Sequence, residues 1–564
     1  MTLSVLLACF LLPLLSIGQN NNYGWVKQIG GAMPQYAHAI VADKYNNTYT
    51  IGQYSGTAGV NIDSVVVPLV GYGNSDIFVL KQDPEGNTVW IKGFGGKGNE
   101  TPYGITLDNW GGVYLTGSFA DTVDFDPAAN QSFPLVSVGS ISGFILKLDT
   151  AGDFKWAVKT SSDSFNSSSG VTSIDADLNG NLYATGFFAA IASFKTAAND
   201  STLVTNGGTD VFVYKLDTAG IYKWAKSFGA AQYDYGYTVK ADNNGNVYTV
   251  GMVIGEADFD PGAGVFNMKG GGGQYGGGGL FISKLDANGN FVWAKNLGEN
   301  TNNTGVFANY FNHLNIDKNN DLLITGWFTG TVDLDPSDND SLMFTSNGSY
   351  DAFVAKYNPS GEIIWAKKVG GAGADYGRAI TTDVIGNVYI GGVFRQTVVF
   401  DSATNVSHTS TLSSTNDVYI AKYTPDGDFT WAVKYGGTAN EYITSITTDY
   451  KNNVYSSGNF LTNIIGNTAN FHTGNDTVAR FSNGYDGYIH KMICVDTSLT
   501  NITEVACNEY IYGNETYTQS GIYEFQYWSV GGCDSTVIID LTVNYIDKPY
   551  ITVNNFTLGV TSAY

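Results

Sequence analysis

Two stretches of sequence decide the fold: RAITTDVIGNVYIGGVF at residues 378–394 and VYIAKYTPDGDFTWAVKY at residues 418–435. Each stretch holds two runs that are rich in β-branched and aromatic residues. A turn with Asp and Gly separates the two runs in each case, which is typical of a β-hairpin. The sequence therefore predicts four strands, at residues 378–382, 387–394, 418–423 and 429–435, that form two hairpins.

This four-strand unit repeats along the chain, because three of its residues recur at a spacing of 65 to 75 positions. The tryptophan of the fourth strand recurs as Trp25, Trp90, Trp156, Trp224, Trp293, Trp365 and Trp431. The aspartate of the first turn recurs as Asp43, Asp108, Asp177, Asp242, Asp317, Asp383 and Asp449. The lysine of the third strand recurs as Lys81, Lys147, Lys215, Lys284, Lys356, Lys422 and Lys491. A fixed period of this length predicts a repeat architecture.

Four strands in about 67 residues are the size of one β-propeller blade, so the fold class is all-β. The two ends of the array do not match: the chain opens with a fourth strand at Trp25, and the last unit stops after the third strand, at Lys491. A closed ring resolves this mismatch, because the first strand can complete the last blade and leave no open edge. We therefore expect a seven-bladed β-propeller that its N-terminal strand closes.

The turn Asp242-Asn-Asn-Gly-Asn-Val-Tyr248 and the strand Phe353-Val-Ala-Lys356 resemble motifs of a bacterial β-propeller repeat family found in large secreted and surface proteins. The resemblance covers residues 25 to about 494. It implies a propeller scaffold, and the family as such implies no reaction.

Composition divides the chain into four parts. Residues 1–18 read as a secretory signal peptide, because an apolar run that is too short to span a bilayer precedes polar residues. Residues 23–494 are the expected propeller, residues 495–545 a small β module, and residues 546–564 the start of a further, truncated segment. The small module resembles the two-cysteine modules that precede type IX secretion sorting domains. That resemblance implies a disulfide between Cys507 and Cys533.

The net charge of −23 disfavours nucleic acid and anionic lipid as partners. Beyond the signal peptide no apolar run reaches the length of a membrane span. We therefore expect a secreted or cell-surface bacterial protein that is a monomer, without a membrane span or a nucleic-acid partner.

A carboxylate motif recurs in the long connections between the second and third strands. Its members are Asp124 and Asp126, Asp258 and Asp260, and Asp333 and Asp335, each pair followed by Pro. Alternate Asp residues on an extended segment project to one side, where their oxygens could hold Ca²⁺. The alternative is a strand end at which Asp caps a Pro turn. No other cofactor is indicated.

Two further repeated side chains have a structural explanation. The seven lysines are expected to bury their stems between blades and to pair with a neighbouring carboxylate. The seven tryptophans are expected to pack between blades.

The sequence contains none of the catalytic motifs that we sought, so we expect no enzyme. The long connections between the second and third strands vary most between repeats, which favours their face as the binding face. The predicted function is a non-catalytic extracellular or cell-surface scaffold that binds a protein or glycan partner through those loops. The alternative is a secreted polysaccharide hydrolase or lyase that uses the same face.

Overall fold

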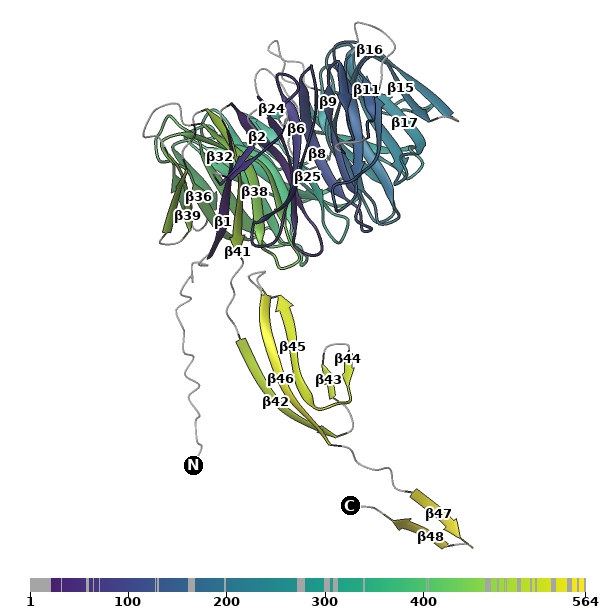
Figure 1. Cartoon of the computed structure of the whole chain (residues 1–564), viewed down its shortest axis with the longest axis vertical. Helices are drawn as coiled ribbons and strands as arrows, with labels where there is room; N and C mark the ends of the chain where they lie inside the picture. The colour runs from purple at the N-terminus through teal and green to yellow at the C-terminus, as the bar shows by residue number, and fades with distance from the viewer. Residues whose placement is uncertain are drawn as a thin grey trace.

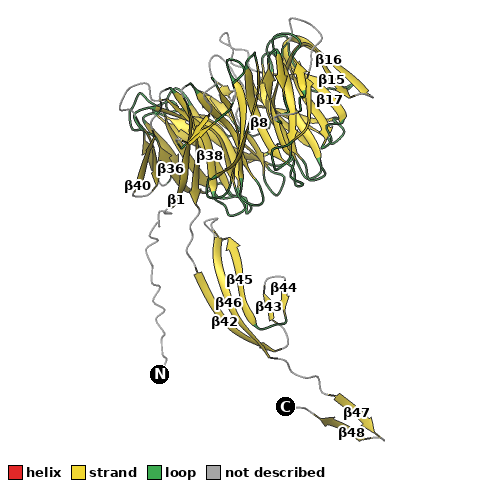
Figure 2. Ribbon diagram, viewed as in Figure 1, coloured by secondary structure: helices red, strands yellow, loops and turns green. Residues whose placement is uncertain are grey.

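In the computed structural model of the chain, every regular element of the described residues is a β-strand (Figures 1 and 2). The structure describes residues 22–561 apart from 32, 57–59, 64, 70, 127, 129–130, 161–167, 197–198, 271–278, 299–304, 308–312, 338–339, 402, 404, 462–467, 474–475, 481, 483, 494–498, 508–509, 513–514, 529–533, 545–549 and 555–556. No helix that could cross a membrane occurs within that part of the chain.

Within the described residues, seven sheets share a core of four antiparallel strands, and each sheet is named below by its first strand. The first strands are β2 (Gln35–Ala42), β8 (Glu100–Leu107), β14 (Ser169–Ala176), β18 (Tyr235–Ala241), β25 (Leu314–Ile316, preceded by β24, Gly305–Phe307), β31 (Tyr376–Thr382) and β37 (Asn440–Thr448). The second strands are β3 (Thr48–Tyr54), β9 (Val113–Phe119), β15 (Asn181–Thr196), β19 (Val247–Val253), β26 (Leu322–Thr329), β32 (Val388–Phe394) and β38 (Val454–Leu461).

The third strand of each sheet carries the repeated lysine and the fourth carries the repeated tryptophan. The third strands are β6 (Asp76–Gln82), β12 (Ser142–Leu148), β16 (Asn199–Asp217), β22 (Gly279–Leu285), β29 (Asp351–Tyr357), β35 (Asp417–Tyr423) and β41 (Tyr485–Ile493). The fourth strands are β7 (Thr88–Gly96), β13 (Phe154–Thr160), β17 (Tyr222–Phe228), β23 (Phe291–Leu297), β30 (Ile363–Gly371), β36 (Phe429–Tyr435) and β1 (Asn22–Gly30).

The first strands lie in contact in chain order, from β2 through β8, β14, β18, β25 and β31 to β37, and β37 contacts β2 again. This arrangement is that of a β-propeller. Strand β1 pairs antiparallel with β41, with Trp25 opposite Lys491. The pairing expected for the N-terminal strand is therefore confirmed.

The long connections between second and third strands form hairpins of their own. These are β4 (Val60–Ile62) with β5 (Val65–Val67), β10 (Thr122–Asp124) with β11 (Pro134–Val136), β20 (Glu256–Asp258) with β21 (Asn267–Lys269), β27 (Thr331–Asp333) with β28 (Met343–Thr345), β33 (Thr397–Asp401) with β34 (Val406–Thr409), and β39 (Ala469–Thr473) with β40 (Asp476–Arg480). In the β14 sheet the ends of β15 and β16 pair directly. Strands β4, β10 and β33 pair with β1, β7 and β30, which are fourth strands of the preceding sheets. These hairpins therefore cover sheet edges.

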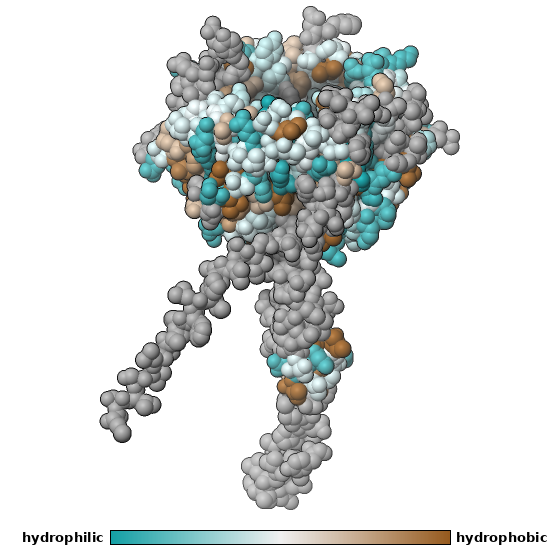
Figure 3. Space-filling model, turned by 90° about the vertical axis from the view of Figure 1, so that its left-hand side faces the viewer, coloured by the Kyte–Doolittle hydropathy of each residue, from teal (hydrophilic) through white to brown (hydrophobic). Residues whose placement is uncertain are grey.

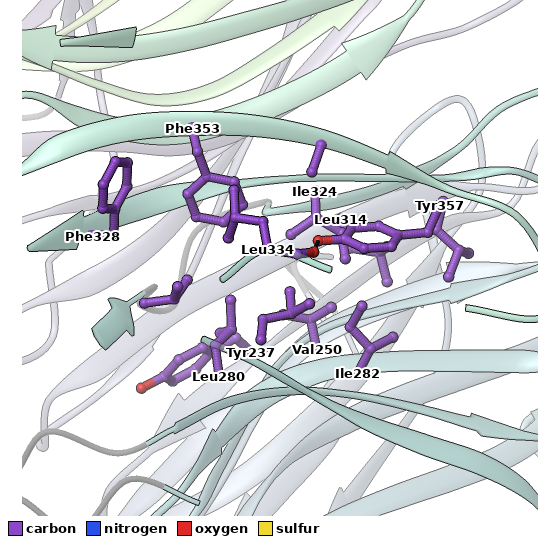
Figure 4. Close-up of a cluster of buried hydrophobic side chains, with 14 of the residues drawn as sticks. Tyr237, Val250, Leu280, Ile282, Leu314, Ile324, Phe328, Leu334, Phe353 and Tyr357 are labelled. Carbon is purple, nitrogen blue, oxygen red and sulfur yellow. Dashed lines mark hydrogen bonds between the residues drawn. The ribbon is translucent and has the colours of Figure 1, made fainter. Parts of the chain in front are cut away.

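The hydrophobic core lies between neighbouring sheets. Figure 4 shows one such layer, in which Val250 and Ile282 of the β18 sheet face Ile324 and Tyr357 of the β25 sheet. The Tyr357 hydroxyl donates to the Leu334 carbonyl at 2.9 Å, so the connection that carries Asp333 and Asp335 is tied into this core. Each core thus holds two sheets together.

Three smaller groups of strands follow the seven sheets. Strands β42 (Leu499–Cys507), β46 (Asp534–Asn544) and β45 (Gly521–Trp528) form a sheet in that order, with β42 and β46 parallel. Strands β43 (Tyr510–Tyr512) and β44 (Glu515–Tyr517) form a hairpin, as do β47 (Tyr550–Asn554) and β48 (Thr557–Thr561). The signal peptide and Cys533 lie outside the described residues, so the disulfide stays a prediction.

Candidate functional site

The repeated Asp, Tyr, Lys and Trp residues meet at the junction of neighbouring sheets. In the β14 sheet, Asp177 Oδ1 accepts the backbone N–H groups of Asn179 and Asn181 at 2.9 and 2.8 Å. The other carboxylate oxygen accepts the Asn181 side-chain amide at 2.7 Å and the Tyr183 hydroxyl at 3.1 Å. The motif therefore fixes both its own turn and the tyrosine ring of the next strand.

The lysine lies over that tyrosine ring and reaches the next sheet. Lys215 Nζ is 4.9 Å from the Tyr183 ring centroid and donates to the Ala287 carbonyl at 2.9 Å. Trp224 Nε1 donates to the same carbonyl at 3.1 Å. We call this paired bond the interface clasp. At Gly289, two residues beyond the carbonyl, φ is +79° and a Cβ would lie 2.9 Å from the Trp224 ring, so the turn requires glycine.

The interface clasp recurs at six of the seven junctions in the described sheets. The carbonyls that it holds belong to Pro84, Thr150, Thr218, Ala287, Pro359 and Pro425. The structural interpretation of the lysines and tryptophans is thus supported, but the usual lysine partner is a carbonyl and a tyrosine ring. A close carboxylate pair forms where Leu323 replaces the tyrosine: Lys356 Nζ lies 2.8 Å from Asp317 and 3.2 Å from Asp321.

The first Asp of each Asp-x-Asp-Pro motif accepts backbone N–H groups of its own hairpin. Asp124 Oδ1 accepts from Asp126 at 3.1 Å and from Phe133 at 2.8 Å. Asp258 and Asp333 make the equivalent bonds, and Asp126, Asp260 and Asp335 each accept one N–H two residues on. The residue between the two acids is buried, as with Phe125. These contacts agree with the turn-capping alternative.

Within the described residues, no group of three or more His, Cys, Asp or Glu side chains is placed to hold a metal. The Ca²⁺ site at Asp124, Asp126, Asp258, Asp260, Asp333 and Asp335 stays a prediction.

A small cavity lies among the first strands of five sheets. It measures about 80 Å³, and its lining includes His38, Tyr103, Thr172, Tyr237 and Thr444. Each of these five residues stands at a β-bulge in its strand. Bulges re-aim side chains, and here they bring five different residues to one cavity. Burial lowers the pKa of His38 to about 4, so its imidazole is neutral at pH 7. The volume is well below that of a small-molecule pocket.

A larger cavity of about 430 Å³ lies among the turns that follow the first strands. Its lining includes residues 43–45 of the β2 sheet, residues 108–111 of the β8 sheet, Thr150 and Tyr450. Tyr45, Trp110 and Tyr450 are 68%, 65% and 55% exposed. Lys44 and Asn109 add polar groups to the wall. We call this the aromatic cavity, and its size is within the range of ligand pockets.

The three aromatic residues stand on turns that hydrogen bonds hold rigid. The Tyr45 N–H donates to Asp43 at 2.9 Å, and the Trp110 N–H donates to Asp108 at 2.9 Å. The Tyr450 N–H donates to the Asn46 side chain at 3.2 Å, which joins the turn of the β37 sheet to that of the β2 sheet. The rings are therefore presented by a preformed backbone.

The residues of this cavity are not predicted as a site from any motif, although the sequence carries a signal for them. The two positions after the turn aspartate are Leu-Asn, Asn-Asn, Lys-Asn and Val-Ile in four repeats, starting at residues 178, 243, 318 and 384. They include an aromatic residue only in the β37, β2 and β8 sheets, which are consecutive around the ring. On the side drawn in Figure 3, hydrophobic residues form small patches among hydrophilic ones. Isolated exposed apolar residues are ordinary, so the convergence on one cavity is the informative observation.

No protein-family model matches the chain. An uncharacterized WD repeat-containing protein of Acanthamoeba polyphaga mimivirus is 23% identical, over 86% of this chain and 40% of that protein. This chain therefore spans less than half the length of that relative. The repeat character of the relative agrees with the β-propeller architecture.

Solved structures with a similar fold include an ulvan lyase, which is a polysaccharide lyase. It is 11% identical with a TM-score of 0.40, over 82% of this chain and 98% of that chain. A virginiamycin B lyase from Staphylococcus aureus is 12% identical with a TM-score of 0.31, over 69% and 95% of the two chains.

Proposed function

We propose that the chain is a non-catalytic extracellular β-propeller that binds a neutral glycan in the aromatic cavity. The observation that carries this proposal is the convergence of Tyr45, Trp110 and Tyr450 on one cavity of ligand size. Aromatic faces pack against the C–H faces of sugar rings, while Lys44 and Asn109 can donate to sugar hydroxyls.

The charge around the aromatic cavity favours an uncharged glycan. The chain carries a net charge of −23, and Asp43 and Asp108 line the same wall. A polyanionic chain would be repelled by that field.

The proposal places binding on the opposite face from the one that the sequence favoured. The long connections between second and third strands fold into hairpins, and several of these add to neighbouring sheets. Side chains of these connections, such as Val123 and Phe125, are buried. The length of these connections therefore has a structural explanation.

We further propose that the seven sheets are the blades of one ring, which β1 closes, within residues 23–494. Secretion by way of residues 1–18, a cell-surface location, a monomeric state and a separate module at residues 495–545 belong to the same proposal. The pairing of β1 with β41 and the contact of β37 with β2 support the closure.

A polysaccharide hydrolase or lyase is the second candidate, and His38 is the observation that favours it. A histidine that lines a cavity is a candidate general base. Burial lowers the pKa of His38 to about 4, however, so this imidazole binds a proton only weakly at pH 7. The cavity that holds His38 is too small for a sugar ring with its neighbours, which favours binding over catalysis.

Titration calorimetry against a panel of neutral oligosaccharides and one uronate-containing oligosaccharide tests the proposal. We expect heat with a neutral sugar and at least a tenfold weaker Kd in Trp110→Ala, which corresponds to the loss of about 1.4 kcal/mol of packing on the indole ring. Tyr233→Ala is the matched control, because Tyr233 is similarly exposed but does not line the cavity.

Two results would contradict the proposal. The first is an equal loss of affinity in Trp110→Ala and Tyr233→Ala. The second is the release of new reducing ends or unsaturated products from the wild-type mixture, lost in His38→Ala, which would establish the enzyme instead.

A further inference from the structure

Four junctions between neighbouring sheets bury a pair of acidic side chains. In each pair, the first acid lies on the third strand of one sheet, and the second lies 24 positions later, within one residue of the start of the first strand of the next sheet. All eight residues are at most 1% exposed. The pairs are Asp76 with Glu100, Asp210 with Asp234, Asp351 with Asp375, and Asp417 with Glu441.

In the first pair, a backbone N–H group satisfies one oxygen of each acid. Asp76 Oδ2 accepts the Tyr72 N–H at 3.0 Å, and Glu100 Oε2 accepts the Gly96 N–H at 3.1 Å. The remaining oxygens, Asp76 Oδ1 and Glu100 Oε1, are buried and have no hydrogen-bond partner among the described residues. Asp351, Asp375 and Asp417 each leave one such oxygen, and Glu441 leaves two.

The glycine pair that ends the fourth strand makes room for these acids. A Cβ on Gly95 would overlap the Asp76 carboxylate, and a Cβ on Gly370 would lie 2.7 Å from Asp351 Oδ1. Gly371 donates its N–H to Asp375 at 2.7 Å. The repeated Gly-Gly of the sequence is therefore part of the acid-pair site.

We propose that the pairs Asp76–Glu100, Asp351–Asp375 and Asp417–Glu441 are proton-binding sites, in which one carboxyl O–H donates to a carboxylate oxygen of the partner and so links two neighbouring sheets. The Asp210–Asp234 pair is not included, because the backbone N–H groups of Ala230 and Ile254 donate to the two oxygens of Asp234. In each of these three pairs, a single proton between the two carboxyl groups gives a partner to one unpartnered oxygen of both acids.

Backbone bridges join the residues directly before the acids, Ser75 with Asn99 and Tyr350 with Ala374, so the two acids of these pairs lie beside each other. In the third pair the Glu441 N–H donates to the Asn416 carbonyl at 3.0 Å. Two buried carboxylates so placed cannot both stay ionised, because neither is solvated and their charges repel.

The surrounding charges show which member holds the proton. Lys368 lies 3.6 Å from Asp351, and Lys434 lies 3.1 Å from Asp417, so these aspartates are the ionised members. Their partners are then the protonated ones. Burial and the neighbouring aspartate raise the pKa of Asp375 to about 8 and that of Glu441 to about 9.

In the part of the chain that the structure describes, no lysine or arginine pairs with Asp76 or Glu100, and the titratable groups that face the pair are Tyr54 and Tyr72. Burial, followed by Asp76, raises the pKa of Glu100 to about 8. Glu100 is therefore the protonated member of this pair.

Other repeats place neutral side chains at the same position. The second acid stands three residues before the bulge of the first strand, and Gln35 and Ser169 occupy that place in the β2 and β14 sheets. Glutamine has the shape of a protonated glutamic acid. At the position of Glu100 and Glu441, other repeats thus carry uncharged side chains, which agrees with a protonated, uncharged carboxyl at these two residues.

The sign of the pH dependence follows from the raised pKa values. A carboxyl whose pKa is higher in the folded state stabilises the fold fully below its unfolded pKa of about 4.5. That stability is lost as the pH rises through 8 to 9, where Glu100, Asp375 and Glu441 release their protons. The protein is therefore expected to be more stable at pH 6 than at pH 9.

The test compares the full chain with the triple variant Glu100→Gln, Asp375→Asn and Glu441→Gln. Infrared spectroscopy of the wild type at pH 7 should show the carbonyl stretch of protonated carboxyl groups, and this band should fall in the triple variant. The Tm of the wild type should drop between pH 6 and pH 9, and the triple variant should lose most of that drop. Glu256→Gln is the control, because Glu256 is exposed.

Two outcomes would overturn the proposal. One is a wild-type spectrum without a protonated-carboxyl band at pH 7. The other is a Tm at pH 9 that rises with added Ca²⁺ and is lowered by a chelator in the wild type but not in the triple variant, which would make the pairs cation sites. If the triple variant does not fold, the single variant Glu100→Gln carries the same infrared test.

Discussion

Six junctions of the ring and the seventh are built differently. At six junctions, a lysine and a tryptophan of one sheet hold a carbonyl in the turn between the third and fourth strands of the next sheet. Between the β31 and β37 sheets no such turn exists, because the fourth strand of the β37 sheet is β1 from the other end of the chain. The junction next to the sheet that β1 completes therefore lacks the turn on which the interface clasp depends.

We therefore expect the pairing of β1 with β41 and the interface clasp to contribute separately to the free energy of unfolding. Lys422 and Trp431, at the seventh junction, hold the same places as Lys215 and Trp224 elsewhere, with Lys422 5.1 Å from the Tyr389 ring centroid. Burial lowers the pKa of Lys422 to about 8. Variants at matched positions can therefore measure each contribution.

Removal of β1, by deletion of residues 22–30, should have the largest effect. The β37 sheet would keep three strands, and β41 would become an open edge that can pair with other chains. We expect loss of the cooperative thermal transition and aggregation in size-exclusion chromatography. Deletion of residues 550–561 is the control, since β47 and β48 pair only with each other in the described structure. A wild-type Tm after the first deletion would disprove the closure.

The next largest effect should come from Lys356→Met in the junction that uses carboxylates. Lys356 and Asp317 are buried and Asp321 is half-buried, so removal of the lysine leaves buried charge without a counterion, which costs about 3–5 kcal/mol of unfolding free energy. Lys215→Met, at a junction with a tyrosine ring and a carbonyl, should cost about 1 kcal/mol. Urea unfolding at pH 7 measures the free energy of unfolding of both variants. Equal losses in Lys356→Met and Lys215→Met would show that the carboxylate partners make no difference.

The smallest effect should come from removal of the indole hydrogen bond alone. Trp224→Phe loses the bond to the Ala287 carbonyl, whereas Trp431→Phe is made at the junction that has no corresponding turn. The two substitutions remove similar apolar area, so Trp224→Phe should cost about 1 kcal/mol more. Chemical unfolding of both variants under one condition gives the difference. If Trp431→Phe proves as costly, the clasp bond contributes no net stability.

Much of the fold could be predicted from the sequence because each repeat carries its own turn and strand signals. Alternation, Asp-Gly turns and the unmatched strand at Trp25 were enough to predict that β1 pairs with β41. The hairpins in the long connections could not be predicted, because their strands are mostly three to five residues long and carry no clear periodicity.

The candidate site was harder to predict, because its residues look ordinary in isolation. Tyr45, Trp110 and Tyr450 lie in different repeats, and only the ring brings them to one cavity. The acid pairs join sheets across a separation of 24 residues, and nothing local marks Asp76 or Glu100 as buried. Sequence reasoning finds elements, whereas these sites arise where elements meet.

The direction of the interface clasp has one further consequence. At six junctions the lysine and tryptophan of one sheet bind a carbonyl of the next sheet, as Lys147 binds the Thr218 carbonyl, so the contact is head-to-tail rather than mutual. Head-to-tail contacts between like units form either a closed ring or an open helix, depending on the rotation from one unit to the next. A duplicated repeat could therefore form the interface clasp with the repeat before it and with the repeat after it. Gene duplication could therefore lengthen the array one unit at a time, and the accumulated rotation would decide which lengths still close.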